Sequence, residues 1–74
     1  VELTKNEYRI LQCLLENVGK VVSRDSIMEK LWEDEAFVDD NTLTVNVTRL
    51  RRKLEDAGVS DYIRTKKGVG YIIS

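Results

Sequence analysis

The segment from Thr42 to Gly58 constrains the fold most, because it fits two secondary structures at once. Its first seven residues alternate polar and apolar side chains and are rich in β-branched residues, as in a half-buried strand. The same segment carries apolar residues at helical spacing: Leu43, Val47, Leu50 and Leu54. A seven-residue strand leaves the later leucines unexplained, whereas one helix accounts for all four positions. We therefore predict a helix over residues 41–57, ended by Gly58 and capped by Asp39 or Asp40.

The opposite face of this helix mixes small polar, apolar and cationic side chains. At about 100° per residue, five side chains lie opposite the apolar stripe: Asn41, Val45, Thr48, Arg49 and Arg52. Val45 is therefore expected in solvent. In a DNA major groove, arginine binds guanine or phosphate, asparagine binds adenine, and a valine or threonine methyl packs on the thymine methyl. A solvated helix face with one tolerated valine is the alternative interpretation.

Two shorter helices are expected before this one. The first opens with a capping box, Thr4 to Glu7, and stops near Gly19, with Val1–Leu3 before it as the end of a strand. Its expected apolar stripe is Ile10, Leu11, Leu14, Leu15 and Val18, with Cys13 as a packed or half-exposed free thiol beside it. Val21 and Val22 form a short extended piece. The second helix is capped by Ser23 and presents four side chains to the core: Ile27, Met28, Leu31 and Trp32.

An acidic loop and a hairpin complete the expected fold. Residues 33–40 have no periodicity, and Phe37 and Val38 are their apolar anchors. Residues 62–66 and 71–73 alternate as strands around a turn with Gly68 and Gly70. Lys66 and Lys67 at this turn suit a phosphate backbone or a minor groove, or they solvate an ordinary turn. Three helices and a basic hairpin predict an α+β winged helix-turn-helix domain.

Composition limits the chemistry. The 74 residues make one domain with a net charge of −1, but residues 1–40 carry −5 and residues 41–74 carry +4, which favours an anionic partner for the second half. With no histidine and one cysteine, we expect no metal, no cofactor and no catalytic activity. No apolar run suits a membrane and no secretion signal opens the chain, so we expect a cytoplasmic protein without a membrane partner.

Four ordered segments carry a family resemblance: LTKNEYRIL, VVSRDSIMEKLW, FVDDNTLTVNVTRLRRKLE and IRTKKGVGYII. Over its whole length the chain resembles the C-terminal DNA-binding domain of OmpR/PhoB-type response regulators of bacterial two-component systems. The third segment is most similar to Gram-positive regulators that respond to cell-envelope antibiotics. The resemblance implies sequence-specific binding of double-stranded DNA and transcriptional regulation. A winged helix that binds an acidic protein with its basic face is the alternative, although such a partner favours a larger apolar patch.

The resemblance also assigns roles to single residues. The base-facing side chains would be Thr42, Val45, Asn46, Thr48 and Arg49. The DNA backbone would be contacted by Arg24, Trp32, Asn41, Arg51, Arg52, Thr65, Lys66 and Tyr71. Lys67 stands where many relatives carry a minor-groove arginine, and it lacks the planar fork of that residue. The loop that meets RNA polymerase would include Glu33, Asp34, Glu35, Phe37 and Asp39, unless it is only a solvated connector.

The chain departs from the family pattern at its start. It opens on Val1 without a methionine, only the last strand of an N-terminal sheet is expected, and the phosphoacceptor receiver domain is missing. We therefore expect a domain excised from a longer protein whose receiver domain is the target of a sensor kinase. The isolated domain is expected to be monomeric, and it would pair head-to-tail on direct repeats of DNA.

Overall fold

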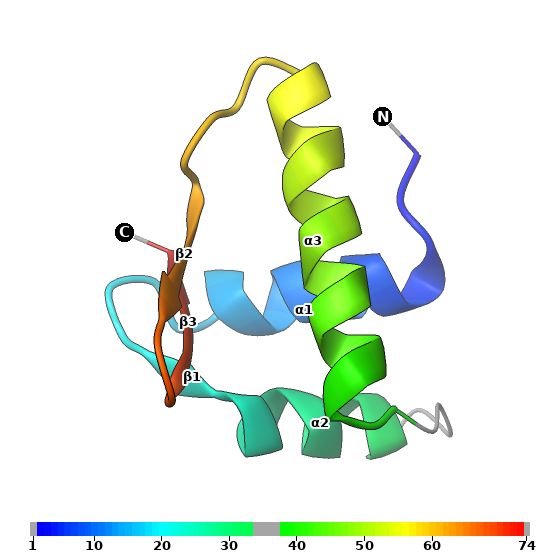
Figure 1. The fold of residues 1–74 in the computed structure, drawn as a ribbon, viewed down its shortest axis with the longest axis vertical. Helices are drawn as coiled ribbons and strands as arrows, with labels where there is room; N and C mark the ends of the chain where they lie inside the picture. Colours follow the sequence, from blue (N-terminus) through cyan, green and yellow to red (C-terminus); the bar gives the residue numbers. More distant parts are fainter. Residues whose placement is uncertain (1, 34–37, 74) are drawn as a thin grey trace.

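The described residues, 2–33 and 38–73 of a computed structural model, form three helices and one three-stranded antiparallel sheet. The helices are α1 (Lys5–Leu15), α2 (Arg24–Glu33) and α3 (Asp40–Asp56), and the strands are β1 (Val22–Ser23), β2 (Ile63–Lys66) and β3 (Gly70–Ile73). In Figure 1, α3 crosses α1, α2 lies below them, and the sheet stands to one side. This arrangement confirms the predicted winged helix-turn-helix architecture.

The segment that fits both a strand and a helix is helical. Asp39 is the N-cap, because its Oδ1 accepts a hydrogen bond of 2.8 Å from the backbone N–H of Thr42. That bond holds the pKa of the exposed Asp39 carboxyl below its usual range. Gly58 follows the helix with φ of +89°, the left-handed conformation that ends many helices. Burial of one apolar stripe outweighs the weak strand preference of the β-branched residues.

The predicted capping box of α1 is present. Thr4 Oγ1 accepts from the Glu7 N–H at 3.2 Å, and Glu7 Oε1 accepts from the Thr4 N–H at 2.8 Å. The Glu7 side chain is also buried, with 1% of its surface exposed, and its Oε1 lies 2.6 Å from Lys53 Nζ on α3. This ion pair ties the start of α1 to the second half of α3.

The expected end of α1 near Gly19 was wrong. The helix ends at Leu15, and the Asn17 side-chain amide donates to the Cys13 carbonyl at 2.8 Å, which satisfies one of the terminal acceptors. Val18 lies beyond the end of the helix and is 55% exposed, and Leu15, about 100° around the helix from the buried Leu14, is 44% exposed; both were predicted to be buried. Cys13 is buried, so of the two interpretations, packed or half-exposed, the packed thiol is confirmed.

The N-terminal strand expected over residues 1–3 was also wrong for the part described. Glu2 to Thr4 belong to no strand, and Val1 lies outside the described residues. A strand needs a neighbour for its backbone hydrogen bonds, and the three described strands pair only with one another. Leu3 instead packs against the edge of the core.

Strand β3 is the centre of the sheet, in the order β1-β3-β2. The hairpin of β2 and β3 was predicted from the sequence. In the structure, Lys66 of β2 lies opposite Gly70 of β3. The pairing of the two-residue strand β1 with β3 was not predicted, and it places Ser23 opposite Gly70. A Cβ atom on Gly70 would lie 1.9 Å from the carbonyl oxygen of Val22, so this approach requires glycine.

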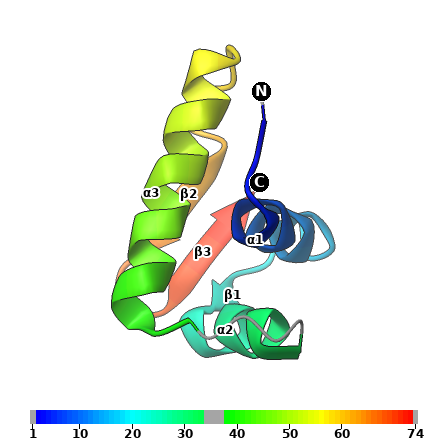
Figure 2. The same ribbon diagram turned by 90° about the vertical axis from the view of Figure 1, so that its right-hand side faces the viewer.

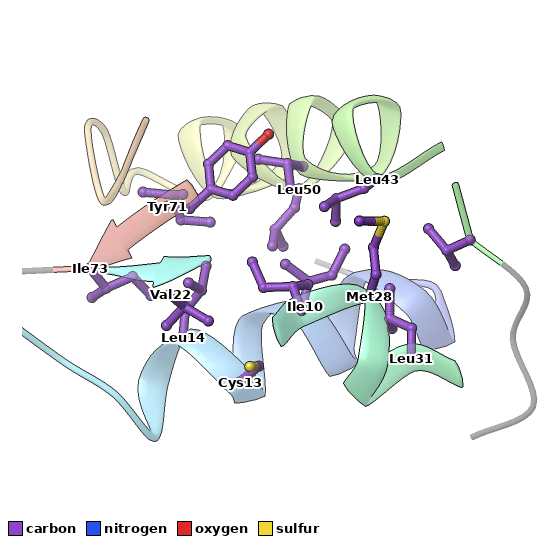
Figure 3. Close-up of a cluster of buried hydrophobic side chains, with 14 residues drawn as sticks. Ile10, Cys13, Leu14, Val22, Met28, Leu31, Leu43, Leu50, Tyr71 and Ile73 are labelled. Atoms are coloured by element: carbon purple, nitrogen blue, oxygen red, sulfur yellow. The ribbon is translucent and has the colours of Figure 1, made fainter. Parts of the chain in front are cut away.

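The core lies between the three helices and one face of the sheet (Figure 3). Its buried apolar side chains are Ile10, Cys13, Leu14, Val22, Ile27, Met28, Leu31, Val38, Leu43, Val47, Leu50, Ile63, Tyr71 and Ile73. Three of the four α2 side chains that we predicted in the core are buried there: Ile27, Met28 and Leu31. The fourth, Trp32, is 49% exposed. No helix in residues 2–33 or 38–73 is long and apolar enough to cross a membrane.

Candidate nucleic-acid interface

The outer face of α3 is exposed as predicted. Val45 is 46% exposed, and the other side chains placed opposite the apolar stripe are also exposed: Asn41, Thr48, Arg49 and Arg52. The inner face holds the helix in this orientation, because Leu43, Val47 and Leu50 are fully or almost fully buried. Arg49 and Arg52 form no hydrogen bond or ion pair within the described part of the chain, so both guanidinium groups are open to a ligand.

Asn46 does not belong to this exposed face. Only 9% of its surface is exposed, and its Nδ2 donates a 2.8 Å hydrogen bond to the Thr42 carbonyl one turn earlier. Its position lies about 60° from the buried stripe rather than opposite it. The assignment of Asn46 to the base-facing set therefore disagrees with the structure, whereas Thr42 is exposed.

Two threonine hydroxyls of α3 are also turned onto the helix itself. Thr44 Oγ1 donates to the Asp40 carbonyl at 3.1 Å, and Thr48 Oγ1 donates to the Thr44 carbonyl at 2.9 Å. Both bonds follow the pattern in which a threonine side chain bonds the carbonyl four residues earlier.

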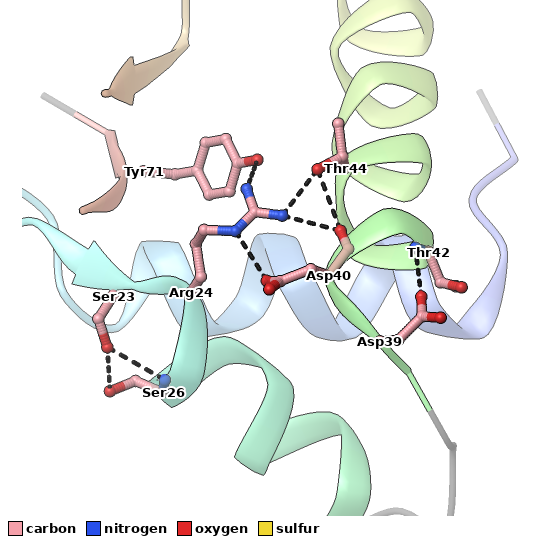
Figure 4. Close-up of polar contacts among 8 residues, drawn as sticks. All are labelled: Ser23, Arg24, Ser26, Asp39, Asp40, Thr42, Thr44 and Tyr71. Atoms are coloured by element: carbon pink, nitrogen blue, oxygen red, sulfur yellow. Dashed lines mark hydrogen bonds and ion pairs between the residues drawn. The ribbon is translucent and has the colours of Figure 1, made fainter. Parts of the chain in front are cut away.

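Arg24 joins three elements at one end of the molecule (Figure 4). From the start of α2, its Nε lies 3.0 Å from Asp40 Oδ1 and its Nη2 donates to Thr44 Oγ1 at 2.7 Å, both on α3. Its Nη1 donates to the Tyr71 hydroxyl on β3 at 2.7 Å. Burial alone would lower the pKa of Arg24, but Asp40 and Tyr71 outweigh it and raise the pKa, so the group stays cationic.

Arg51 lies near the ring of the same tyrosine. Its Nε donates to the Ile63 carbonyl at 3.2 Å and its Nη2 donates to the Thr65 hydroxyl. The guanidinium carbons of Arg24 and Arg51 lie 5.7 and 5.8 Å from the centre of the Tyr71 ring, which suits cation–π contacts. Tyr71 is only 3% exposed, so its predicted contact with DNA phosphate disagrees with its buried position.

Several polar groups of these residues already have protein partners. A phosphate at Arg24 would have to share or replace the bonds described above, whereas Arg51 Nη1 and the Thr65 O–H donate to no group within the described residues. Local sequence pattern could not reveal these partners, because Arg24 lies 16 and 20 residues before Asp40 and Thr44. Only the folded chain brings them together.

Trp32 has a similar internal partner. Its Nε1 donates to the Val38 carbonyl at 3.1 Å, across the segment that joins α2 to α3. The indole N–H predicted to bind phosphate is therefore occupied, while the residue as a whole is 49% exposed. Val38 is completely buried, which confirms it as an apolar anchor of this segment.

The turn between β2 and β3 carries the two predicted lysines. Lys66 and Lys67 are exposed, Gly68 has φ of +77°, and the Val69 N–H donates to the Lys66 carbonyl at 2.9 Å. The Arg24 N–H donates to the Val69 carbonyl at 3.1 Å, which fixes the turn beside the start of α2. The start of α2, the start of α3 and this turn therefore lie at one end of the fold, as Figure 2 also shows.

The predicted polymerase-contact residues are only partly described. Glu33 is the exposed last residue of α2, and Asp39 caps α3. Asp34, Glu35 and Phe37 lie outside the described residues. The contact of this loop with RNA polymerase stays a prediction.

Comparison with known proteins places this geometry in a family. Residues 1–73 match the family model described as "Transcriptional regulatory protein, C terminal". A curated relative, sensory transduction protein BceR of Halalkalibacterium halodurans, is 54% identical over 72 residues, which cover 97% of this chain and 31% of the relative. The chain thus spans about a third of that protein's length.

Solved structures agree in fold. The C-terminal domain of the nisin resistance regulator NsrR, titled a lantibiotic response regulator, superposes with a TM-score of 0.89 at 51% identity and covers 99% of this chain and 74% of that one. The DNA-binding domain of response regulator AdeR, solved with an intercistronic region, superposes with a TM-score of 0.86 at 30% identity and covers 100% and 75%. The chain belongs to the C-terminal domains of transcriptional regulatory proteins, of the OmpR/PhoB winged-helix type, and its similarity to BceR is consistent with the BceR-like subgroup.

Proposed function

We propose that this domain binds double-stranded DNA sequence-specifically and regulates transcription as the effector domain of a two-component response regulator. The observation that carries the proposal is the exposed face of α3, where Val45, Thr48 and Arg49 stand on a helix whose opposite side is buried. A helix of this kind fits the major groove, and an unpaired arginine on it suits the N7 and O6 atoms of guanine.

The hairpin turn provides the second contact. Lys66 and Lys67 are exposed at the same end of the molecule as the start of α3. Their ammonium groups suit phosphates of the backbone or a minor groove beside the helix. Arg52 and Asn41 on α3 add further polar contacts, while Arg24, Arg51 and Tyr71 hold the surrounding elements in place.

The kinship with response regulators supports the wider role. We infer that the parent protein carries a receiver domain that a sensor kinase phosphorylates, and that it acts in the bacterial cytoplasm, where the chromosome lies. Two such domains would occupy direct repeats, each monomeric when free, and residues 33–40 would face RNA polymerase. The similarity to the nisin resistance regulator NsrR, a lantibiotic response regulator, supports a response to lantibiotics.

The proposal is tested by selection from a random-sequence duplex library at several salt concentrations. We expect an enriched motif and a steep loss of affinity with salt, because backbone contacts release counterions. Arg49→Ala should reduce binding to the enriched duplex by roughly 1–3 kcal/mol and relax one position of the motif. Lys20→Ala also removes one positive charge, but from the turn after α1, and it is the matched control.

Two outcomes would contradict the proposal. Binding that is absent at low salt would instead favour a domain that binds an acidic protein with its basic face. Equal losses for Arg49→Ala and Lys20→Ala on all duplexes would mean that α3 does not read bases.

A further inference from the structure

The exposed side chain of Thr48 presents its methyl group rather than its hydroxyl. The hydroxyl donates to the Thr44 carbonyl at 2.9 Å and is therefore turned onto the helix backbone. The methyl is the part of this exposed side chain left to face outward. Thr48 thus offers an apolar contact to a ligand, although a threonine in the sequence suggests a polar contact through its hydroxyl.

Val45 places further methyl groups beside it. The two residues are three apart on α3, so their Cβ atoms are about 5–6 Å apart on one side of the helix. Val45 is 46% exposed and contributes nothing to the buried stripe. Together, Val45 and Thr48 form a small methyl surface next to the open guanidinium of Arg49.

The nearby hydrogen-bonding group is withdrawn from this surface. Asn46 is 9% exposed and its amide nitrogen donates to the Thr42 carbonyl, so its amide is not presented to adenine. The centre of the exposed face therefore recognises a ligand by apolar contact. In a major groove, the apolar group that distinguishes unmodified bases is the C5 methyl of thymine.

We propose that Val45 and Thr48 are specificity-determining residues that recognise the methyl groups of two neighbouring thymines. Base steps are about 3.4 Å apart along the duplex, so methyl-bearing side chains about 5–6 Å apart reach thymines of adjacent or next-adjacent pairs. This inference rests on the proposed DNA binding and adds the chemical feature that is read. The preferred site then contains A·T pairs beside the guanine contacted by Arg49.

Deoxyuridine provides the direct test, because it pairs as thymine does and lacks only the methyl. Duplexes enriched from the random library are resynthesised with deoxyuridine at one thymine at a time. We expect deoxyuridine to lower the affinity about fourfold at each of two positions, because each replacement removes one buried methyl group. Replacement at the other positions should leave the affinity unchanged.

Two substitutions at residue 48 separate the methyl from the hydroxyl. Thr48→Ser keeps the hydroxyl and removes the methyl, so it should lose about fourfold in affinity and become insensitive to deoxyuridine at one position. Thr48→Val keeps a methyl in the outward position and removes the hydroxyl, so it should retain affinity and sensitivity. Val45→Ala removes two methyl groups, so it should lose at least about fourfold in affinity and become insensitive to deoxyuridine at the other position. Equal melting temperatures of the variants confirm that each is folded.

The outcomes distinguish this inference from the proposed function. An enriched motif whose affinity is unchanged by deoxyuridine would overturn the methyl contact and leave DNA binding intact. A loss in Thr48→Val with none in Thr48→Ser would show that the hydroxyl is the reading group, which also overturns it. If no motif is enriched, the inference and the proposed function fail together.

Discussion

Replacing Glu7 with glutamine tests how the buried carboxylate stabilises the fold. Glu7 Oε1 accepts from Lys53 at 2.6 Å and from the Thr4 N–H at 2.8 Å, and the side chain is 1% exposed. Hydrogen bonds to a charged group contribute about 1.5–3 kcal/mol and neutral ones about 0.5–1.5 kcal/mol. Glutamine keeps the size and an acceptor oxygen but removes the negative charge of the acceptor from both bonds, so we expect a loss of about 2 kcal/mol. In a domain of this size, that lowers the melting temperature by about 8–16 °C.

The same substitution predicts a pH dependence with a definite sign. Burial alone would raise the pKa of Glu7, but the bonds from Lys53 and Thr4 outweigh it and hold the pKa below its usual value of 4.5. A carboxyl whose pKa is lower in the folded state stabilises the fold above its unfolded pKa, and the contribution disappears as pH falls through the folded pKa. The difference in stability between the wild type and Glu7→Gln should therefore be largest near pH 7 and narrow below about pH 4.

Urea denaturation followed by circular dichroism, repeated from pH 7 to pH 3, measures this difference. Glu29→Gln is the matched control, because Glu29 lies exposed on α2, and its effect should stay within about 0.5 kcal/mol. A Glu7→Gln protein as stable as the wild type at pH 7 would refute the reasoning. So would a stability gap that does not narrow on acidification, because the loss would then arise from packing rather than charge.

Four further substitutions test other parts of the structure. Gly70→Ala should cost about 1–3 kcal/mol or more in urea denaturation, since its Cβ would lie 1.9 Å from a β1 carbonyl oxygen; an unchanged midpoint would contradict the described β1–β3 approach. Arg24→Met should lower the free energy of unfolding by about 1–3 kcal/mol, because the hydrogen bonds of its guanidinium are lost. Arg49→Met is the control and should leave the urea midpoint nearly unchanged. Val45→Ala should leave the melting temperature nearly unchanged but weaken DNA binding. A large drop in melting temperature would mean that Val45 is buried. Lys67→Ala should weaken binding to all duplexes alike in fluorescence anisotropy, and a loss confined to one sequence would indicate base recognition by the turn.

The features predicted correctly from the sequence depend on neighbours within one or two helical turns. The periodicity of α3 distinguished helix from strand and placed Val45 in solvent. The capping box at Thr4 and the cap at Ser23, whose Oγ accepts from the Ser26 N–H at 3.1 Å, are likewise local hydrogen bonds. Such patterns are visible in sequence because the interacting groups are three or four residues apart.

The features that were missed depend on contacts between segments far apart in the sequence, or on a side chain that competes for a backbone hydrogen-bond acceptor. The internal partners of Arg24 and Arg51 were not predicted: the fold brings the Tyr71 hydroxyl within reach of Arg24 and the Ile63 carbonyl within reach of Arg51. Their contacts with phosphate stay predictions. The end of α1 was misplaced because the Asn17 side chain competes for a backbone acceptor before Gly19 is reached. Trp32 was expected in the core, yet the residue as a whole is 49% exposed.

The guanidinium of Arg24 has a consequence for how this face meets a ligand. Because one planar group ties the start of α2, the start of α3 and strand β3, these elements cannot adjust independently of one another. We therefore expect this surface to keep its arrangement when a duplex docks, so that the protein loses little conformational entropy. The association should therefore resemble rigid-body docking, with a heat-capacity change that reflects the apolar surface buried rather than the folding of a segment.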